Sequence, residues 1–277
     1  MTSKNKIECI SCRSSDFRNN FIVTRKDKFA VTNKRKLKPA RYFECSICGL
    51  FTLDDSPDYQ KIYSDGGYYE SEDKSDTLSF LDRRFNHVIN LAEGKSDNKE
   101  RIKRILSFIN SNINTELNIL DIGAGMGVFF FELFQKTKFK GVAIELDPYC
   151  NLHLKKIFEN YPFYIFNKPI ENFNSENKFN VITINRVLEH IFDPIAFLKT
   201  LKKFMSKKSY VYVEVPDSES YHKGGPNDEA FGYGHYHVYS PIALIKIFNC
   251  AGFKVEKLKR CIEPSKKYTL FGFFTLQ

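Results

Sequence analysis

The sequence lacks any apolar run that approaches the roughly 20 residues needed to span a bilayer. Its first residues, MTSKNKIECISC, also lack the apolar stretch of a secretion signal. These absences predict a cytoplasmic protein without a membrane span. Internal repeats and low-complexity tracts are absent too, while 42% hydrophobic and 15% aromatic residues can build a real core. At 277 residues, the chain suits one large domain or one domain with a small module.

The formal net charge of +9 suits an anionic partner, such as nucleic acid or a nucleotide-linked substrate. The basic residues are nevertheless spread along a chain that is rich in lysine throughout. The densest basic run, residues 24–38, is short and interrupted by an acidic residue and by apolar residues. Nucleic acid therefore stays an open but less favoured partner.

Seven cysteines without a secretion signal argue against a disulfide framework. Four of them form two Cys-x-x-Cys pairs, and two such pairs can complete a tetrahedral Zn²⁺ site: Cys9, Cys12, Cys45 and Cys48. The strand-like segments FRNNFIVTR and ARYFEC between the pairs are typical of a zinc ribbon. Four thiolates leave no open position for a substrate, so we expect residues 1–53 to form a module with a structural zinc.

The rest of the chain divides into a linking region and an alternating region. Residues 54–113 begin with a stretch rich in Asp, Ser, Gly and Tyr, followed by expected helices near 77–93 and 98–112. Residues 114–277 alternate strands with helices and end in two strands near 253–261 and 267–276. This alternation predicts an α/β domain with a Rossmann-like, doubly wound, mainly parallel sheet.

A glycine-rich loop follows the first strand of the alternating region. The run LDIGAGMGVF places Gly123, Gly125 and Gly127 where the chain turns tightly and a ligand can approach the unpaired N–H groups of a helix. The spacing is not the G-x-G-x-x-G of dinucleotide binders, which argues against a pyrophosphate ligand. Glu145 ends the second strand, where a carboxylate can accept hydrogen bonds from both hydroxyls of a ribose. Loop and carboxylate together favour a cofactor that contains adenosine.

Residues 118–276 resemble the class I S-adenosylmethionine-dependent methyltransferases. ILDIGAGMGVFF matches the first motif of that family, and FNVITINRVLEHIFDP is similar to the motif after its fourth strand. The ending, GFKVEKLKR and YTLFGFFTL, resembles its last hairpin, which implies a seven-stranded sheet with an antiparallel last strand. RYFECSICGLFTL followed by YSDGGYY resembles the zinc-ribbon lead-in of a subgroup that often acts on sugars, nucleotide-sugars and other surface-polymer precursors.

The resemblance implies roles in binding S-adenosylmethionine. Gly123, Gly125 and Gly127 would pass beneath the methionine portion of the cofactor. Asp121 would help to fix its amino group, and Glu145 would hold the ribose.

Three further cofactor-binding residues follow from the same resemblance. Asn185, just past the fourth strand, would face the methyl sulfonium. Ile170 would line the adenine position, with Pro169 and Glu171 as alternatives. Tyr69, with its neighbour Tyr68, would close over the cofactor, although two tyrosines packing a surface loop explain this pair equally well.

The run GHYHVYSP lies after the fifth strand, on the side where we expect the acceptor. It resembles the EH-x-x-x-F-S pattern of the family, with Gly234 in place of the usual glutamate. His235 is the first catalytic candidate, as a general base or an acceptor clamp, and a backbone-bonded loop histidine is the alternative. His237 is the second candidate. We expect His190 to be structural, and a metal site of His235 and His237 is disfavoured because no third ligand has suitable spacing.

The sequence thus predicts an enzyme that transfers methyl groups from S-adenosylmethionine to a small acceptor, linked to a sugar or a nucleotide. O-methylation is preferred. Two alternatives remain: an RNA methyltransferase that docks RNA on the ribbon and the basic run, and a non-catalytic scaffold that binds the cofactor. The sequence leaves the oligomeric state open.

Overall fold

The computed structural model describes residues 8–23, 40–54, 76–232 and 234–277. The basic run 24–38 and the pair Tyr68 and Tyr69 lie outside the described residues. The helices are α3 (Thr77–Ile89), α4 (Asp97–Asn112), α5 (Val128–Lys136), α6 (Pro148–Ile157), α7 (Pro194–Leu201), α8 (Glu219–Gly224) and α9 (Pro241–Cys250). Four short 3-10 turns are η2 (Ile170–Asn172), η3 (Leu188–His190), η4 (Lys202–Phe204) and η5 (Gly225–Asn227).

The described strands form two sheets. They are β1 (Phe17–Val23), β2 (Ala40–Cys45), β3 (Phe51–Leu53), β4 (Leu117–Ile122), β5 (Phe139–Ile144), β6 (Phe163–Phe166), β7 (Phe179–Asn185), β8 (Met205–Pro216), β9 (His237–Val238), β10 (Phe253–Ile262) and β11 (Tyr268–Leu276). The larger sheet has seven strands in the order β10-β11-β8-β7-β4-β5-β6. Strands β4 to β8 pair in parallel, whereas β11 is antiparallel to both β8 and β10. The Rossmann-like seven-stranded sheet with an antiparallel last strand is therefore confirmed.

Local sequence explains where several helices begin. The Asp193 side chain accepts the Ala196 N–H at 2.9 Å ahead of α7, and the Ser240 hydroxyl accepts the Ala243 N–H at 3.0 Å ahead of α9. In both helices a proline occupies the first turn, where no backbone donor is needed. Helix α3 ends at Ile89, four residues before the predicted end.

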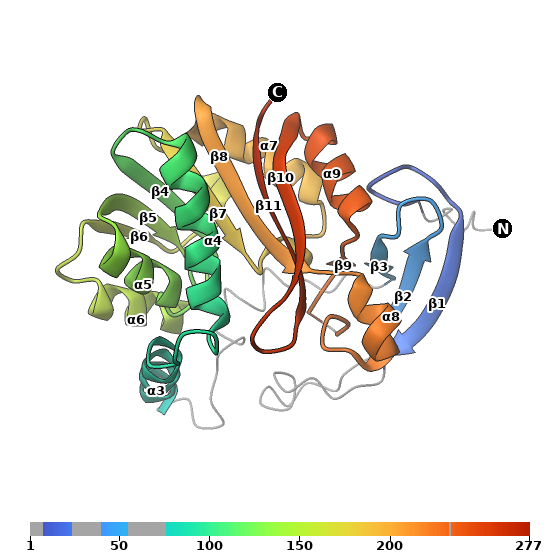
Figure 1. Cartoon of the computed structure of the whole chain (residues 1–277), viewed down its shortest axis with the longest axis horizontal. Coiled ribbons are helices and arrows are strands. Elements are labelled where there is room, and N and C mark those ends of the chain that lie inside the picture. The colour runs from blue at the N-terminus through green and yellow to red at the C-terminus, as the bar shows by residue number, and fades with distance from the viewer. Residues whose placement is uncertain (1–7, 24–39, 55–75, 233) are drawn as a thin grey trace.

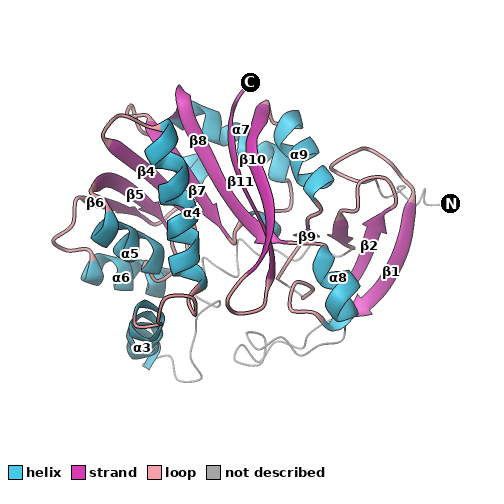
Figure 2. Cartoon of the chain, in the orientation of Figure 1, coloured by secondary structure: helices cyan, strands magenta, loops and turns pink. Residues whose placement is uncertain are grey.

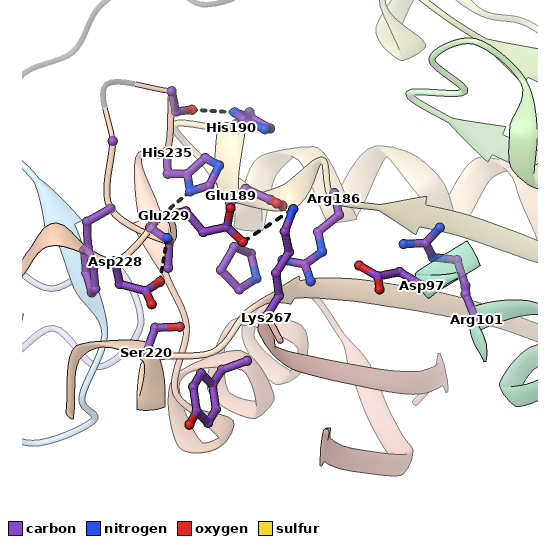
Figure 3. Close-up of a pocket in the computed structure, with 16 residues that line it drawn as sticks. Asp97, Arg101, Arg186, Glu189, His190, Ser220, Asp228, Glu229, His235 and Lys267 are labelled. Atoms are coloured by element: carbon purple, nitrogen blue, oxygen red, sulfur yellow. Dashed lines mark hydrogen bonds and ion pairs between the residues drawn. The ribbon is translucent and has the colours of Figure 1, made fainter. Parts of the chain in front are cut away.

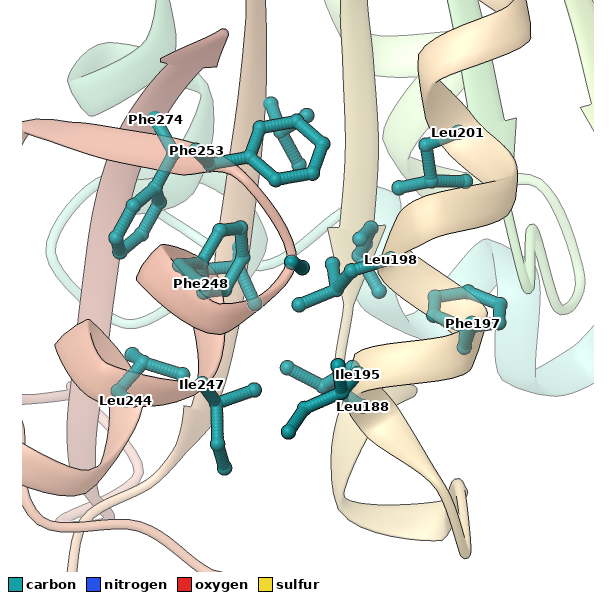
Figure 4. Close-up of a cluster of buried hydrophobic side chains, with 14 of the residues drawn as sticks. Leu188, Ile195, Phe197, Leu198, Leu201, Leu244, Ile247, Phe248, Phe253 and Phe274 are labelled. Carbon is teal, nitrogen blue, oxygen red and sulfur yellow. The ribbon is translucent and has the colours of Figure 1, made fainter. Parts of the chain in front are cut away.

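Helices cover both faces of the larger sheet (Figure 1 and Figure 2). Helices α4, α5 and α6 bury side chains such as Ile105 and Leu154 on one face. Helices α7 and α9 cover the other, where Leu198 and Phe248 meet at the centre of a large apolar cluster (Figure 4). Burial on both faces explains why the parallel strands read as nearly continuous apolar runs. No helix among the described residues is both long and apolar enough to cross a membrane.

The smaller sheet joins distant parts of the chain in the order β1-β2-β3-β9. Its last strand, β9, comes from the C-terminal half and pairs antiparallel with β3, Val238 opposite Phe51 and His237 opposite Thr52. The predicted ribbon module, residues 1–53, therefore takes its fourth strand from the segment that holds the two candidate histidines. The boundaries at residues 53 and 113 stay predictions.

Candidate active site

A cavity of about 650 Å³ lies at the carboxyl ends of β4, β5 and β7, the edge where open α/β sheets bind their ligands. Five of the predicted cofactor residues line it: Gly123, Gly125, Glu145, Ile170 and Asn185. Pro169 and Glu171 line it as well. The carboxyl ends of four strands, β4 to β7, thus bring these residues to one place.

Two glycines of the loop meet different surroundings. Gly123 has a φ of +73°, and a Cβ there would lie 2.3 Å from Cγ2 of Val187. Gly127, with a φ of +82°, precedes α5, and its Cβ would lie 2.7 Å from Leu154 and 2.9 Å from Phe158. A side chain at either position would therefore be disfavoured by the left-handed backbone conformation and by steric clash with neighbouring side chains. Gly123 keeps the cavity wall open, whereas Gly127 lets α5 approach α6 and does not line the cavity.

The carboxylate of Glu145 links the glycine loop to the turn after β5. Its oxygens accept the N–H of Gly125 at 2.6 Å and the N–H of Asp147 at 2.8 Å. Burial nevertheless raises the pKa of Glu145 to about 7. A carboxylate has about four lone-pair sites, so two backbone donors leave capacity for ribose hydroxyls.

Asp121 lies behind the cavity rather than in its lining. It is buried, and its Oδ1 accepts hydrogen bonds from the Thr183 hydroxyl at 2.6 Å and the Asn185 amide at 3.2 Å. Burial raises the pKa of Asp121 to about 7. The structure therefore places Asp121 where it orients Asn185 between β4 and β7.

The cavity carries an unsatisfied polar atom that fits the expected cofactor. The Oδ1 of Asn185 is buried and has no hydrogen-bond partner among the described residues. Buried polar atoms normally have partners. A ligand amine or hydroxyl beside Asn185 would supply one, as the amino group and ribose of S-adenosylmethionine can.

A second cavity, of about 340 Å³, lies next to the first (Figure 3). Arg186 and His190 line both, which makes them the shared wall. The lining of the second cavity is mainly polar and charged, with Asp97, Arg101, Glu189, Asp228, Glu229, His235 and Lys267. A molecule in this cavity would face a cofactor across Arg186 and His190.

His235 lines the second cavity and is oriented by the backbone. Its Nδ1 lies 2.8 Å from the carbonyl oxygen of Ala230, and no carboxylate is needed for this orientation. His190 contacts the carbonyl of Gly234 through its own Nδ1, and the two rings lie 4.8 Å apart at 72° (Figure 3). Desolvation, together with the charge of His235, lowers the pKa of His190 to about 3, so this imidazole is neutral.

His237 lies outside the lining of both cavities, buried in β9. Its Nε2 is 3.1 Å from the carbonyl oxygen of Phe192, and its Nδ1 is 3.4 Å from the Thr52 hydroxyl. Burial lowers its pKa to about 4. These contacts join β9 to β3 and to the loop before α7, and they place His237 apart from His235.

A buried cluster of charges supports the shared wall. Glu214 accepts a bidentate pair of hydrogen bonds from Arg101, at 2.9 and 2.6 Å, and a further one from Arg104 at 3.0 Å. Arg186 donates to the same carboxylate through Nε at 3.3 Å, and it has a positive φ of 57°. The three guanidinium groups hold the pKa of Glu214 well below its usual range despite complete burial.

The four predicted zinc ligands come together in the small sheet. Their sulfur atoms all lie within 4.8 Å of one another, with 3.5 Å between Cys9 and Cys48 and 3.4 Å between Cys12 and Cys45. Thiolates about 2.3 Å from a tetrahedral zinc lie about 3.8 Å apart. The four cysteines thus fit a structural zinc, and they form no disulfide.

Sequence reasoning did not select Glu189 or Arg186. Glu189 is 1% exposed, and its burial raises its pKa to about 7. Both residues belong to the NRVLEH run after β7. The resemblance places this run near the methyl sulfonium, which could have pointed to both residues. Their place beside His235 in one cavity could not be predicted, because His235 lies far from them in the sequence.

Comparisons with known proteins agree with this geometry. Residues 95–258, more than half of the chain, match the family described as methyltransferase domain. A similar solved structure is magnesium protoporphyrin IX methyltransferase from Synechocystis PCC 6803 with bound S-adenosylhomocysteine. It is 13% identical, with a TM-score of 0.56 over 73% of this chain and 97% of that one. Another, 1,6-didemethyltoxoflavin-N1-methyltransferase from Burkholderia thailandensis, is 13% identical, with a TM-score of 0.57 over 84% and 96%.

A curated relative is the rRNA adenine N-6-methyltransferase of Limosilactobacillus reuteri, 36% identical over 88 residues. The match spans 27% of this chain and 36% of the relative, so the chain covers about a third of that protein's length. Fold and cavities define an α/β protein with a large cavity at the carboxyl edge of its sheet. The chain belongs to the methyltransferase-domain family, and its fold is that of the class I S-adenosylmethionine-dependent methyltransferases.

Proposed function

We propose that the chain methylates a hydroxyl group of a small acceptor linked to a sugar or a nucleotide. The observation that carries the proposal is the pair of adjoining cavities, which share Arg186 and His190. A cofactor in the larger cavity and an acceptor in the smaller one would meet at this wall. Alignment of the two reacting groups is the main contribution of such a protein to the rate.

S-adenosylmethionine supplies an activated methyl group on a sulfonium, which favours transfer to a nucleophile. Glu145 and Asn185 bind and orient this cofactor, and Ile170 lines the position proposed for its adenine. Tyr69 remains a proposed cover for the cofactor. The smaller cavity holds the acceptor, and its walls keep water from competing for the methyl group.

The preference for oxygen follows from the polar groups beside the shared wall. An alcohol must lose its proton as the new bond to carbon forms, and a histidine or a carboxylate can assist this loss. Glu189, His190 and His235 lie together at that point. We therefore assign His235 to acceptor activation, and we assign His237, with its two buried ring contacts, to holding β9 in place.

The charges of the smaller cavity support a hydroxyl-rich acceptor over a polyanion. Four acidic residues line it (Asp97, Glu189, Asp228 and Glu229) against three basic ones (Arg101, Arg186 and Lys267). Mixed charges of this kind donate to and accept from sugar hydroxyls, whereas a nucleic-acid groove is predominantly positive. Surface-polymer precursors carry such hydroxyls. We place the reaction in the cytoplasm, where the four thiolates of the ribbon stay reduced.

Methylation of RNA is the second candidate, and the Limosilactobacillus reuteri relative, named as an rRNA adenine N-6-methyltransferase, favours it. The zinc ribbon and the basic run 24–38 would then serve as the docking surface. In this case the transferred label would appear in ribosomal RNA, and small sugars would stay unlabelled.

A binding measurement followed by a labelling assay tests the proposal. Calorimetry should show that S-adenosylhomocysteine binds, and that Glu145→Ala weakens binding about 10- to 100-fold because hydrogen bonds to a charged group are lost. Glu176→Ala removes an exposed carboxylate that lines neither cavity and serves as the matched control. Methyl-labelled cofactor is then incubated with sugars, nucleotide-sugars and ribosomal RNA. Binding without label in any of these would favour the non-catalytic scaffold.

A further inference from the structure

Glu189, His190 and His235 bring three metal-binding atoms, one carboxylate oxygen and two imidazole nitrogens, to one point of the smaller cavity. One donor atom from each residue lies within 4.8 Å of the donor atoms of the other two. We propose that this triad binds a divalent transition-metal ion, which holds the oxygen of the acceptor during methyl transfer. The inference rests on the proposed function, because it specifies how the acceptor hydroxyl is activated.

The backbone fixes the histidines in the tautomer that a metal requires. Each Nδ1 faces a carbonyl oxygen, that of Ala230 for His235 and that of Gly234 for His190. A carbonyl only accepts, so each Nδ1 carries a hydrogen, and Nε2 is the ring nitrogen that can bind a metal ion when the ring is neutral. Histidines that ligate metals commonly donate their other N–H to a backbone carbonyl in this way.

Glu189 supplies the negative charge. It is 1% exposed, and its Oε2 has no hydrogen-bond partner among the described residues. A buried carboxylate oxygen without a partner is costly. A cation shared with His190 and His235 would satisfy this oxygen.

The donor set selects the kind of metal. Two imidazoles and one carboxylate form a three-ligand site that leaves positions for water or substrate. Imidazole favours transition metals such as Zn²⁺ and Fe²⁺, whereas Mg²⁺ prefers oxygen ligands. All three residues line the smaller cavity, which is the proposed acceptor site (Figure 3).

Arg186 lies on the same wall and opposes the binding of a cation. Its guanidinium points to Glu214, whose carboxylate is 3.3 Å from Nε and partly offsets the charge. Because Arg101 and Arg104 also bind Glu214, some positive charge persists around the triad. We therefore expect micromolar rather than nanomolar affinity for the metal ion.

The ion would act as a Lewis acid. The acceptor hydroxyl binds the ion, which makes the O–H more acidic, and the proton leaves to water. A lone pair of the oxygen forms the new bond to the methyl carbon. The carbon–sulfur bond breaks, and its electron pair stays on sulfur as the thioether of S-adenosylhomocysteine. The metal ion keeps its oxidation state throughout.

Metal titration tests the site independently of any acceptor. The full chain, with one equivalent of Zn²⁺ in the ribbon, is titrated with Mn²⁺ and with Zn²⁺ by calorimetry, with and without S-adenosylhomocysteine. We expect one further equivalent to bind. Glu189→Gln and His235→Ala should each lose it, while retaining the ribbon zinc. His87→Ala removes an exposed histidine from α3 and should bind the further equivalent like the wild type.

Binding of S-adenosylhomocysteine reports whether each variant folds. If the cofactor product binds and no further metal equivalent does, the metal site is wrong while the cofactor assignment stands. The same holds if Glu189→Gln and His235→Ala bind the further metal equivalent like the wild type. If metal binds and S-adenosylhomocysteine does not, the proposed function fails and the metal site remains.

Discussion

At the scale of single residues, the carboxylate of Glu145 is the central group of the proposed cofactor site. It lies between the glycine loop and the start of α6, and it accepts one N–H from each side. Burial raises the pKa of Glu145, and the negative charge of Asp147 raises it further. Affinity for the cofactor should therefore depend on the protonation of one residue.

Cofactor affinity should rise with pH around neutrality. The pKa of Glu145 is about 7, so below this pH the carboxyl is protonated and accepts ribose hydroxyls less well. The dissociation constant of S-adenosylhomocysteine, measured by calorimetry between about pH 6 and 8, should fall severalfold as the pH increases. Glu145→Gln should bind weakly and with a smaller dependence on pH, because only Asp121, behind Asn185, still titrates in this range. A constant value for the wild type would contradict this role.

The same shift affects folding with the opposite sign. Because the folded pKa is raised above the unfolded value of 4.5, the contribution of Glu145 to stability is fully present below pH about 4.5. It is lost as the pH rises through about 7. Opposite trends of stability and affinity would separate a direct effect on binding from an effect on folding.

At the scale of elements, the short strand β9 connects the ribbon to the acceptor cavity. Ser240, just after β9, contacts the carbonyl of Cys48, and the Ser11 hydroxyl donates to the carbonyl of Ala243 at 3.1 Å. The Tyr42 hydroxyl of β2 lies 2.7 and 2.5 Å from the carbonyl oxygens of Gly232 and His235, and its one O–H can donate to either of them. The ribbon therefore positions the segment that carries His235.

Removal of zinc from the ribbon should abolish methyl transfer while leaving cofactor binding nearly intact. Cys45→Ser breaks the Cys₄ set and loosens the small sheet, whereas most of the cofactor cavity is built on the larger sheet. We expect activity to fall more than tenfold and S-adenosylhomocysteine affinity to change less than about threefold. Cys250→Ser, at an exposed cysteine of α9, is the control. A loss of affinity equal to the loss of activity would refute this separation.

The two sheets differ in how far the sequence could predict them. Residues 117–276 have continuous apolar strands, capped helices and a glycine loop, and each of these signals is local. Strand β9 has only two residues and no periodicity, so its pairing with β3 has no local signal. The contact of Glu189 and His190 with His235 likewise depends on two loops that meet only in the folded chain. Their residue types were visible in the sequence, but their contact was not.

At the scale of the whole molecule, a buried ionic cluster joins the elements around the two cavities. Helix α4 contributes Arg101 and Arg104, β8 contributes Glu214, and Arg186 follows β7. Glu263, beyond the end of β10, pairs with Arg104 at 2.9 Å. Buried ion pairs of this kind fix the relative positions of their elements more than they increase the free energy of unfolding. The reason is that the cost of desolvating the charges offsets most of their attraction. The cluster therefore fixes the shared wall between cofactor and acceptor.

The net charge of +9 suits an RNA acceptor, so the salt dependence of binding should distinguish RNA from a small sugar-like acceptor. A basic protein that binds RNA through several phosphates loses about 10³- to 10⁵-fold in affinity between about 50 and 200 mM salt. The acceptor cavity has four acidic and three basic lining residues, so a sugar-like acceptor should lose almost nothing over this range. We therefore expect methyl transfer to the preferred small acceptor to keep its KM within about twofold, measured with labelled cofactor at both salt concentrations. Binding of a labelled ribosomal RNA fragment, followed by fluorescence anisotropy, should be weak and strongly dependent on salt. Tight RNA binding that exceeds non-specific affinity at the higher salt concentration would instead favour the RNA methyltransferase.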